Sequence, residues 1–353
     1  MLTDREVKMD ALVRGLMGSE DGRRLLAGSI GRCGGTLLRN IEACTFPAVT
    51  DPVRLANARH GIFMDTETTG LGETDRVFQL AMRKFTFDDQ GILGLGEVFD
   101  RLRDPGMEIP EKVVRLTHIT NEMVKGKVLD DAEVAAFIDG TEKFFCHNAG
   151  FDRKMVERNF PGAAFDRFDF HCTSEEVEWL LRGHNGRSLE LLAKQAGYDY
   201  GSHNALNDIN VMPYVLSRAT EGLGTPFTEM LEKGAQGQIL LALCGKTFDH
   251  NEALKEKGYR WSPDGYEAGG TPKSWFRMIE NDPETLALEA DFLRPIARGG
   301  QITIQAYATT PKERYSARPA KQRVSFRLEP VRDISDAVRQ NVDVQDAQPS
   351  FGF

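Results

Sequence analysis

Apolar and polar positions recur with different periods along this chain, and the changes of period predict where helices and strands lie. Residues 1–59 carry apolar side chains at three- and four-residue spacing, which predicts a helical N-terminal extension. From residue 60 the pattern is that of strands, with GIFMDTE followed by VFQLAMRKFTF and ILGLGEVFDRL around the turn DDQG. A helix at DDAEVAAFID and a short apolar strand at KFFCHN come next.

Helical patterns dominate the chain after that strand. They lie at FDRKMVERN, TSEEVEWLL, SLELLAKQAG and NALNDINVMPYVLSRAT. Hairpin strands followed by strand-to-helix crossovers predict an α/β domain over residues 60–220, a mixed sheet flanked by helices. The run EGLGTPFTE then predicts a linker over residues 221–234.

The C-terminal third predicts a small accessory domain and a tail. Residues 235–295 favour an α+β unit in which GYRWSPDGYEAGGTPKSWFRMI forms a hairpin with a tryptophan on each arm. Arg260, Lys273 and Arg277 interleave with these tryptophans, which is typical either of a nucleic-acid stacking surface or, as we favour, of a small hairpin core. Residues 296–353 predict a basic arm that ends in a mobile tail.

Composition restricts the class of protein. The 353 residues are enough for two or three domains, and 41% hydrophobic with 27% charged residues is typical of a folded protein. No run approaches the roughly 18–20 apolar residues of a membrane span, and MLTDREVKMD lacks the apolar stretch of a secretory signal. We therefore expect a cytoplasmic protein with no membrane partner. Five scattered cysteines without C-x-x-C spacing argue against disulfides and zinc ribbons.

The net charge of −9 is unevenly distributed. Residues 61–220 hold 18 basic and 27 acidic side chains, so their net charge of −9 equals that of the whole chain. The stretch from Arg294 to Arg332 is instead basic, with only Glu313 and Glu329 as acids. It is either a phosphate-contacting arm or a solvated tail. If it holds substrate, deleting everything after Glu289 should weaken binding and leave the active site intact.

Three acidic segments stand where strands end or helices begin. Asp65 and Glu67 are two residues apart at the end of an apolar strand, so both carboxylates share one face. Asp152 lies near a helix start in HNAGFD, and His203 and Asp208 open another helix in HNALND. Taken singly, each segment is typical of a solvated strand end or a capped helix, but together they predict one polar site.

These segments resemble the three motifs of the DnaQ-type, or DEDDh, 3′–5′ exonucleases of the DNA polymerase III epsilon and ribonuclease T type. DTETTGL matches the first motif, HNAGFD the second and H-x-x-x-x-D the third, over about residues 61–220. Asn204 stands where the tyrosine branch of the family has its tyrosine, and His203 stands at the offset of the histidine branch. The resemblance implies a ribonuclease H-like fold for the predicted mixed sheet.

Four carboxylates without a cysteine ligand make a hard, oxygen-rich site that suits Mg²⁺ or Mn²⁺. Two such ions about 3.5 to 4 Å apart would clamp the attacking and leaving oxygens during phosphodiester cleavage, with His203 as the general base. The resemblance implies that Asp65, Glu67 and Asp208 hold the catalytic ion, and that Asp65 bridges to a second ion assisted by Asp152. Bound metal would also reconcile an acidic domain with a polyanionic substrate.

The resemblance further implies contacts with the 3′ end of the substrate. The Thr66 backbone would touch the terminal hydroxyl, glycine-rich backbone at Gly70 would approach the ligand, and Leu71 would wedge against the last bases. Ile119 in RLTHIT, together with Asn148 and Phe151 in the second motif, would complete the contacts. Asn148 could instead cap the helix, and Phe151 could instead belong to the core. For Phe151 we favour the core position over a nucleotide contact.

The leading hypothesis is a metal-dependent 3′–5′ exonuclease acting on single-stranded or frayed 3′ ends, with DNA favoured over RNA. An exoribonuclease, a proofreading-type subunit docked on a polymerase through the flanking segments, and an inactive binding module are the alternatives. The sequence predicts neither the pathway nor the oligomeric state.

Overall fold

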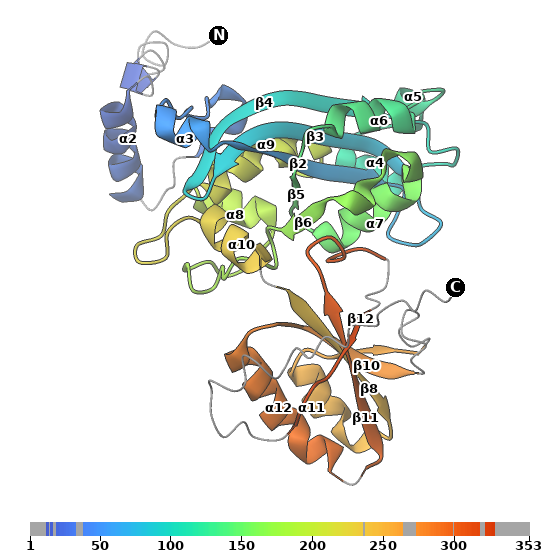
Figure 1. Ribbon diagram of the computed structural model, residues 1–353. Helices are drawn as coiled ribbons and strands as arrows, with labels where there is room; N and C mark the ends of the chain where they lie inside the picture. The colour runs from blue at the N-terminus through green and yellow to red at the C-terminus, as the bar shows by residue number, and fades with distance from the viewer. Residues whose placement is uncertain are drawn as a thin grey trace, which may run out of the picture.

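The computed structural model describes residues 12–13, 15–16, 19–32, 38–235, 237–263, 273–298, 300–317 and 322–328. Within them, two sheets form the centres of two bodies, a larger domain and a smaller module that lies beneath it in Figure 1. We call the larger domain the nuclease domain, after the activity expected from its motifs. No helix of these residues is long and apolar enough to cross a membrane. The predicted end of the basic tail, after residue 328, lies outside the described residues.

The nuclease domain is built on a five-stranded mixed sheet, which confirms the predicted fold class. Its strand order is β4-β3-β2-β5-β6, with β4, β3 and β2 antiparallel and β5 and β6 parallel to β2. The strands are β2 (Arg59–Thr68), β3 (Val77–Asp88), β4 (Gly91–Leu102), β5 (Lys143–Cys146) and β6 (Asp169–Cys172). The sequence analysis missed β6.

Helices cover both faces of this sheet, as Figure 1 shows. One face packs on α8 (Leu189–Gln195), α9 (Ala205–Leu216) and α10 (Pro226–Ala235), and the other on α6 (Asp131–Ile138) and α7 (Ala149–Asn159). The short helices α4 (Glu111–Thr117) and α5 (Asn121–Val124) follow β4, and 3-10 turns η2 (Pro161–Ala163) and η3 (Phe165–Arg167) follow α7. The β2 run Ile62–Met64 is fully buried because both faces of the sheet are covered.

Two predictions inside the nuclease domain are wrong. TSEEVEWLL forms turns rather than a helix, because the Glu176 carboxylate folds inward to accept the Cys172 N–H at 3.1 Å. The predicted linker over residues 221–234 is largely helix α10, whose Phe227 and Met230 are fully buried in the core. Pro226 at the helix start was the signal for it, since proline is favoured at that position.

The N-terminal extension is helical only in part. It contains α2 (Glu20–Arg32), the turn η1 (Ile41–Ala43) and α3 (Pro52–Ala56), but β1 (Arg39–Asn40) pairs in parallel with β7 (Tyr198–Asp199). Ile41 is buried in the nuclease core, and the Tyr214 hydroxyl donates to the Cys44 carbonyl at 3.0 Å. The boundary predicted at residue 59 therefore falls inside the packed domain.

We call residues 237–328 the accessory module. It contains β8 (Gln238–Gly245), η4 (Phe248–His250), α11 (Asn251–Glu256), β9 (Arg260–Ser262), β10 (Ser274–Glu280), α12 (Pro283–Ala297), β11 (Ile302–Thr309) and β12 (Gln322–Val324). The sheet order is β12-β11-β8-β10-β9, and every pairing is antiparallel. Without β12, this is the β-α-β-β-α-β arrangement of ferredoxin-like units. The hairpin predicted between Trp261 and Trp275 is present as β9 and β10.

The boundary predicted at residue 295 is also wrong, because β11 and β12 come from the segment expected to be a basic arm. Between them, residues 310–316 reach the nuclease domain, and we call them the anchor segment (Figure 1). Its Arg314 is 2% exposed and pairs with Glu176, so it is not a free phosphate contact.

Candidate active site

Strand β2 brings two of the predicted acids onto one face of the sheet. Phe63, Asp65 and Glu67 alternate along the strand, so their side chains point the same way. Phe63 packs in the core with Ile209 of α9, which fixes that face toward the start of α9. Asp208 lies in the first turn of the same helix. Strand alternation and helix packing thus bring the first and third motifs together.

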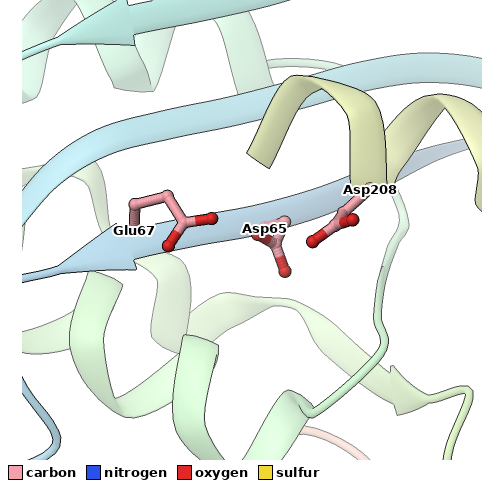
Figure 2. A group of neighbouring side chains, drawn as sticks. All are labelled: Asp65, Glu67 and Asp208. Carbon is pink, nitrogen blue, oxygen red and sulfur yellow. The ribbon is translucent and has the colours of Figure 1, made fainter. Parts of the chain in front are cut away.

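Asp65, Glu67 and Asp208 form a compact carboxylate cluster (Figure 2). One oxygen from each side chain lies within 4.8 Å of those from the other two. The Oδ1 atom of Asp208 is buried and accepts no hydrogen bond from any residue that the structure describes. An unpaired buried carboxylate oxygen is costly, so this oxygen is available to a ligand that the described residues do not supply.

The pKa values of these acids show how strained the cluster is without a cation. Burial, followed by the charges of Asp152, Asp208 and Glu67, raises the pKa of Asp65 well above its usual range. Burial and the neighbouring acids raise the pKa of Glu67 to about 8. Burial raises the pKa of Asp208 to about 7, against an opposing contribution from the Tyr200 hydroxyl. Crowded carboxylates repel each other and resist ionisation.

This donor set fits a divalent cation. The three ligands are carboxylates, one has a free buried oxygen, and their mutual repulsion would be relieved by two positive charges. An all-oxygen set of this kind suits hard ions rather than zinc held by sulfur. The cluster can therefore hold a divalent metal ion at the end of β2.

Asp152 stands beside the cluster rather than in it. Its Oδ1 accepts hydrogen bonds from the Thr66 N–H at 3.1 Å and the Thr66 hydroxyl at 2.7 Å. Burial raises the pKa of Asp152 to about 7, and its charge raises the pKa of the three clustered acids. Asp152 thus ties α7 to β2. Because the Thr66 N–H donates to Asp152, the backbone group of Thr66 that can contact a substrate is its carbonyl oxygen.

His203 is placed differently from the acids. It is exposed, and its backbone is left-handed with φ of 63°, an uncommon conformation for a residue with a side chain. Its charge contributes to lowering the pKa of Glu190 on α8, after the larger effects of Lys194. The structure therefore holds His203 on the loop before α9, and its role as a general base remains a prediction.

The loop after β2 presents Leu71 to solvent at 85% exposure. Asp75 organises this loop by accepting hydrogen bonds from the Thr69 hydroxyl at 2.8 Å and the Gly72 N–H at 2.7 Å. A Cβ on Gly70 would lie 2.6 Å from the Asp75 carboxylate, so a larger residue there would have to displace the Asp75 side chain. Gly70 therefore shapes the loop, and Leu71 is free to contact a ligand as predicted.

The remaining predicted contacts have different surroundings. Asn148 is exposed at the start of α7, and its side chain caps no backbone N–H there. Phe151 is half-buried against the nuclease core, in agreement with the favoured core position. Ile119 is only 3% exposed and packs with Phe78, Ile109 and Val124, and its contact with the terminal nucleotide stays a prediction.

Tyr200 is a site residue that the sequence analysis missed. Its hydroxyl affects the pKa of Asp208, and burial together with the Asp208 charge raises the pKa of Tyr200 itself. It precedes HNALND by a few residues and lies outside the motif pattern, so only its nearness in sequence could have suggested it.

Metal binding should be visible as a pH-dependent change in stability. Because folding raises the pKa values of these acids, their protonated forms stabilise the metal-free protein, fully below about pH 4, and this contribution is lost as the pH rises through about 7 to 8. Added Mg²⁺ or Mn²⁺ should therefore raise the melting temperature more at about pH 8.5 than at about pH 5. Thermal unfolding with metal or EDTA checks this, and an equal shift at both pH values would contradict it.

Comparisons with known proteins find relatives of the part of the chain that holds this cluster. Residues 62–216 match the sequence model of RNase_T, described as an exonuclease family. The chain is 30% identical over 177 residues to a DNA polymerase III PolC-type from Lacticaseibacillus paracasei, and 26% identical over 178 residues to one from Staphylococcus aureus. These matches cover 47% and 48% of this chain but only 12% of each relative.

Among solved structures, Exonuclease X bound to 5′-overhanging duplex DNA aligns with a TM-score of 0.36 and 21% identity. The alignment covers 46% of this chain and 97% of Exonuclease X. A single-strand complex of Escherichia coli ExoI aligns with a TM-score of 0.42 and 15% identity, over 63% of each chain. From the sequence match and the carboxylate cluster together, residues 62–216 are an exonuclease domain of the DnaQ-like 3′–5′ exonuclease family.

Proposed function

We propose that this protein is a divalent-metal-dependent exonuclease that removes nucleotides from the 3′ ends of single-stranded or frayed nucleic acid, with DNA favoured over RNA. The observation that carries the proposal is the cluster of Asp65, Glu67 and Asp208 within an exonuclease-family domain. The preference for DNA is supported by the curated relatives, which are DNA polymerases by name.

In this proposal Asp65, Glu67 and Asp208 hold one Mg²⁺ or Mn²⁺ ion, and Asp65 with Asp152 helps to hold a second. When bound, such ions lower the pKa of a water molecule and stabilise the oxygen that leaves the phosphate. The protein keeps the acids close and half-buried, so that their charges are directed at the cation rather than at solvent. Thr66 fixes the orientation of Asp152 through its two hydrogen bonds.

His203 would take the proton from the attacking water. An imidazole with a usual pKa near 6.5 can do so at neutral pH, and the exposed loop position allows His203 to turn toward a bound substrate. Leu71, the Thr66 carbonyl, Asn148 and the edge of Phe151 would contact the terminal nucleotides, with Gly70 shaping the loop.

Replacing His203 by alanine should lower kcat by roughly 10² to 10⁴-fold, the usual contribution of a general base. Metal affinity should change little, because His203 is not part of the carboxylate cluster. Single-turnover cleavage and Mn²⁺ titration of wild type and H203A measure the two quantities. A collapse of metal affinity would instead make His203 a ligand.

Digestion of matched DNA and RNA strands, single and duplex, with Mg²⁺, Mn²⁺ or EDTA tests the substrate class. We expect single-stranded DNA to be shortened fastest, and no cleavage in EDTA. Faster trimming of RNA would favour the exoribonuclease alternative. Weak activity that rises sharply on addition of a replicative polymerase would favour a docked proofreading-type subunit.

A further inference from the structure

The loop that joins β2 to β3 presents an apolar side chain to solvent. We call residues 69–76 the β2–β3 loop, and its Leu71 is 85% exposed. At the base of the loop the Thr68 hydroxyl donates to the Gly70 carbonyl at 2.7 Å, and the Asp75 carboxylate folds back onto the loop. These bonds give the loop its shape, but they do not fix its position relative to the rest of the domain.

Helix α7 supplies contacts from outside the loop. Nη1 of Arg158, near the end of α7, donates to the carbonyl oxygens of Gly72 at 3.3 Å and of Glu73. Where the loop rejoins β3, the Val77 N–H donates to the side-chain oxygen of Asn159 at 3.3 Å. The end of α7 therefore holds both the middle of the β2–β3 loop and its return to the sheet.

Arg158 makes these contacts instead of an ion pair. Its Nη2 lies 2.8 Å from the Met155 sulfur, and within the described part of the chain no carboxylate pairs with it. Its Nε is buried without a partner among the same residues, a cost that the other contacts must offset. A guanidinium can reach several acceptors at once, whereas a lysine has a single ammonium head. The charge of Arg158 is thus directed at the loop carbonyls.

The same helix also contacts the strand that carries the acids. Asp152, in the first turn of α7, accepts hydrogen bonds from the N–H and the hydroxyl of Thr66 on β2. Arg158 lies six residues later, which is about 9 Å along an α-helix. Because both contacts come from one continuous helix, α7 fixes the position of the β2–β3 loop relative to the carboxylate cluster.

We propose that Arg158 is a positioning residue that holds the β2–β3 loop against α7, so that Leu71 can separate the last base pair of a duplex end. The inference rests on the proposed function, in which the unpaired 3′ nucleotide then enters the carboxylate cluster. Apolar side chains that part neighbouring bases work against stacking and pairing, so the backbone behind them must not yield. A single strand has no base pair to open, and the contribution of Arg158 should therefore be larger on duplex ends.

Cleavage of matched single-stranded and blunt duplex DNA tests this role. Arg158→Met keeps an unbranched side chain but loses both carbonyl bonds, so the ratio of duplex to single-strand kcat/KM should fall roughly tenfold. Arg158→Lys keeps the charge and should restore part of the ratio. The matched control Arg167→Met removes an exposed arginine from η3 and should leave the ratio at the wild-type value. An equal loss on both substrates in Arg158→Met would overturn the proposal, because a purely structural role predicts that result.

A double variant tests whether Arg158 acts through Leu71. Leu71→Ala should lower the same ratio, since it removes the side chain that the loop presents. Adding Arg158→Met to Leu71→Ala should then change the ratio by less than about twofold, because both changes act through one side chain. If the two losses multiply instead, Arg158 acts independently of Leu71 and the proposal fails.

Opening of the duplex end can also be measured without cleavage. A duplex with 2-aminopurine as its last 3′ base emits more strongly when that base unstacks, and inactive Asp208→Asn protein should produce this rise. Adding Leu71→Ala or Arg158→Met should reduce the rise, and adding Arg167→Met should not. An equal signal with all four proteins, raised or not, would overturn the proposal. If the wild type cleaves nothing, the proposed function is refuted, and the emission still decides the role of Arg158.

Discussion

Asp208→Asn is expected to reduce cleavage to the level of EDTA-treated wild type while leaving the fold as stable or more stable. Asp208 supplies the buried Oδ1 that lacks a partner among the described residues, so its loss removes a metal ligand. The change also removes one negative charge from a crowded cluster, which relieves repulsion on Asp65 and Glu67. Cleavage rates and urea unfolding in EDTA measure both effects.

A matched control for this variant is Glu221→Gln, which removes one exposed acid from the end of the same domain. It should have wild-type activity and stability. Cleavage by Asp208→Asn at a rate close to that of the control would contradict the metal assignment. Reduced stability of Asp208→Asn in EDTA would show that the carboxylate supports the fold rather than strains it.

The second large effect concerns the anchor segment. Glu176 is 4% exposed, and its Oε1 accepts hydrogen bonds from the Arg314 guanidinium at 3.1 Å and the Tyr315 hydroxyl at 2.9 Å. His171 Nδ1 lies 2.8 Å from the other carboxylate oxygen. Burial tends to raise the pKa of Glu176, but the charges of His171 and Arg314 hold it below its usual value. The acid is therefore ionised, and the anchor segment supplies two of the groups that stabilise its charge.

Arg153 adds a second buried link between the two bodies. This residue follows Asp152 on α7, is fully buried, and donates hydrogen bonds to the carbonyls of Lys312 at 2.5 Å and Arg314 at 2.7 Å. Its guanidinium also bonds Glu157 at 2.8 Å and lies over the Phe170 ring at 4.3 Å. The accessory module thus contacts the same helix that carries a site acid.

Arg314→Ala should lower the free energy of unfolding by about 3 to 5 kcal/mol, because it removes one of the two cationic partners of the buried Glu176 carboxylate and leaves one of its oxygens without that hydrogen bond. Arg298→Ala, which removes an exposed arginine at the end of α12, should change it by less than about 0.5 kcal/mol. Denaturant titration of the two variants gives the comparison. If they unfold at the same denaturant concentration, the network contributes nothing to stability.

The same contacts reverse one expectation drawn from the sequence. Deleting everything after Glu289 would remove β11, Arg314 and Tyr315, and would leave Arg153 and Glu176 with unsatisfied buried groups. The nuclease domain is then expected to be destabilised rather than left intact. The truncated chain is therefore a poor test of substrate binding by the C-terminal segment.

The sequence predicted the parts of the site that depend on local rules. Spacing of two residues on a strand places Asp65 and Glu67 on one face, and the apolar run before them predicts a buried strand. Asp208 could be assigned to the start of a helix from its flanking pattern. That the three acids lie close together was expected only from the family motifs. The spacing of apolar residues does not indicate which strand end lies beside which helix start.

Contacts between distant segments could not be predicted in this way. Nothing near Glu176 indicates that Arg314 will pair with it, and the inward turn of Glu176 is what replaces the helix expected at TSEEVEWLL. The burial of Ile119 could not be predicted from its motif position either, because it depends on packing against distant residues. Residues 296–328 were predicted to be an arm because the prediction relied on their basic charge. It overlooked the strand pattern of the residues that form β11.

Polarity of cleavage tests the central claim most directly. A strand labelled at its 5′ end, incubated with wild-type protein and Mg²⁺ or Mn²⁺, should yield a ladder that shortens stepwise from the 3′ end. Asp208→Asn or EDTA should leave the strand at full length. Release of the 5′ label as a mononucleotide, cleavage at internal positions first, or an unchanged ladder in Asp208→Asn would contradict the assignment of this carboxylate cluster as a 3′–5′ exonuclease site.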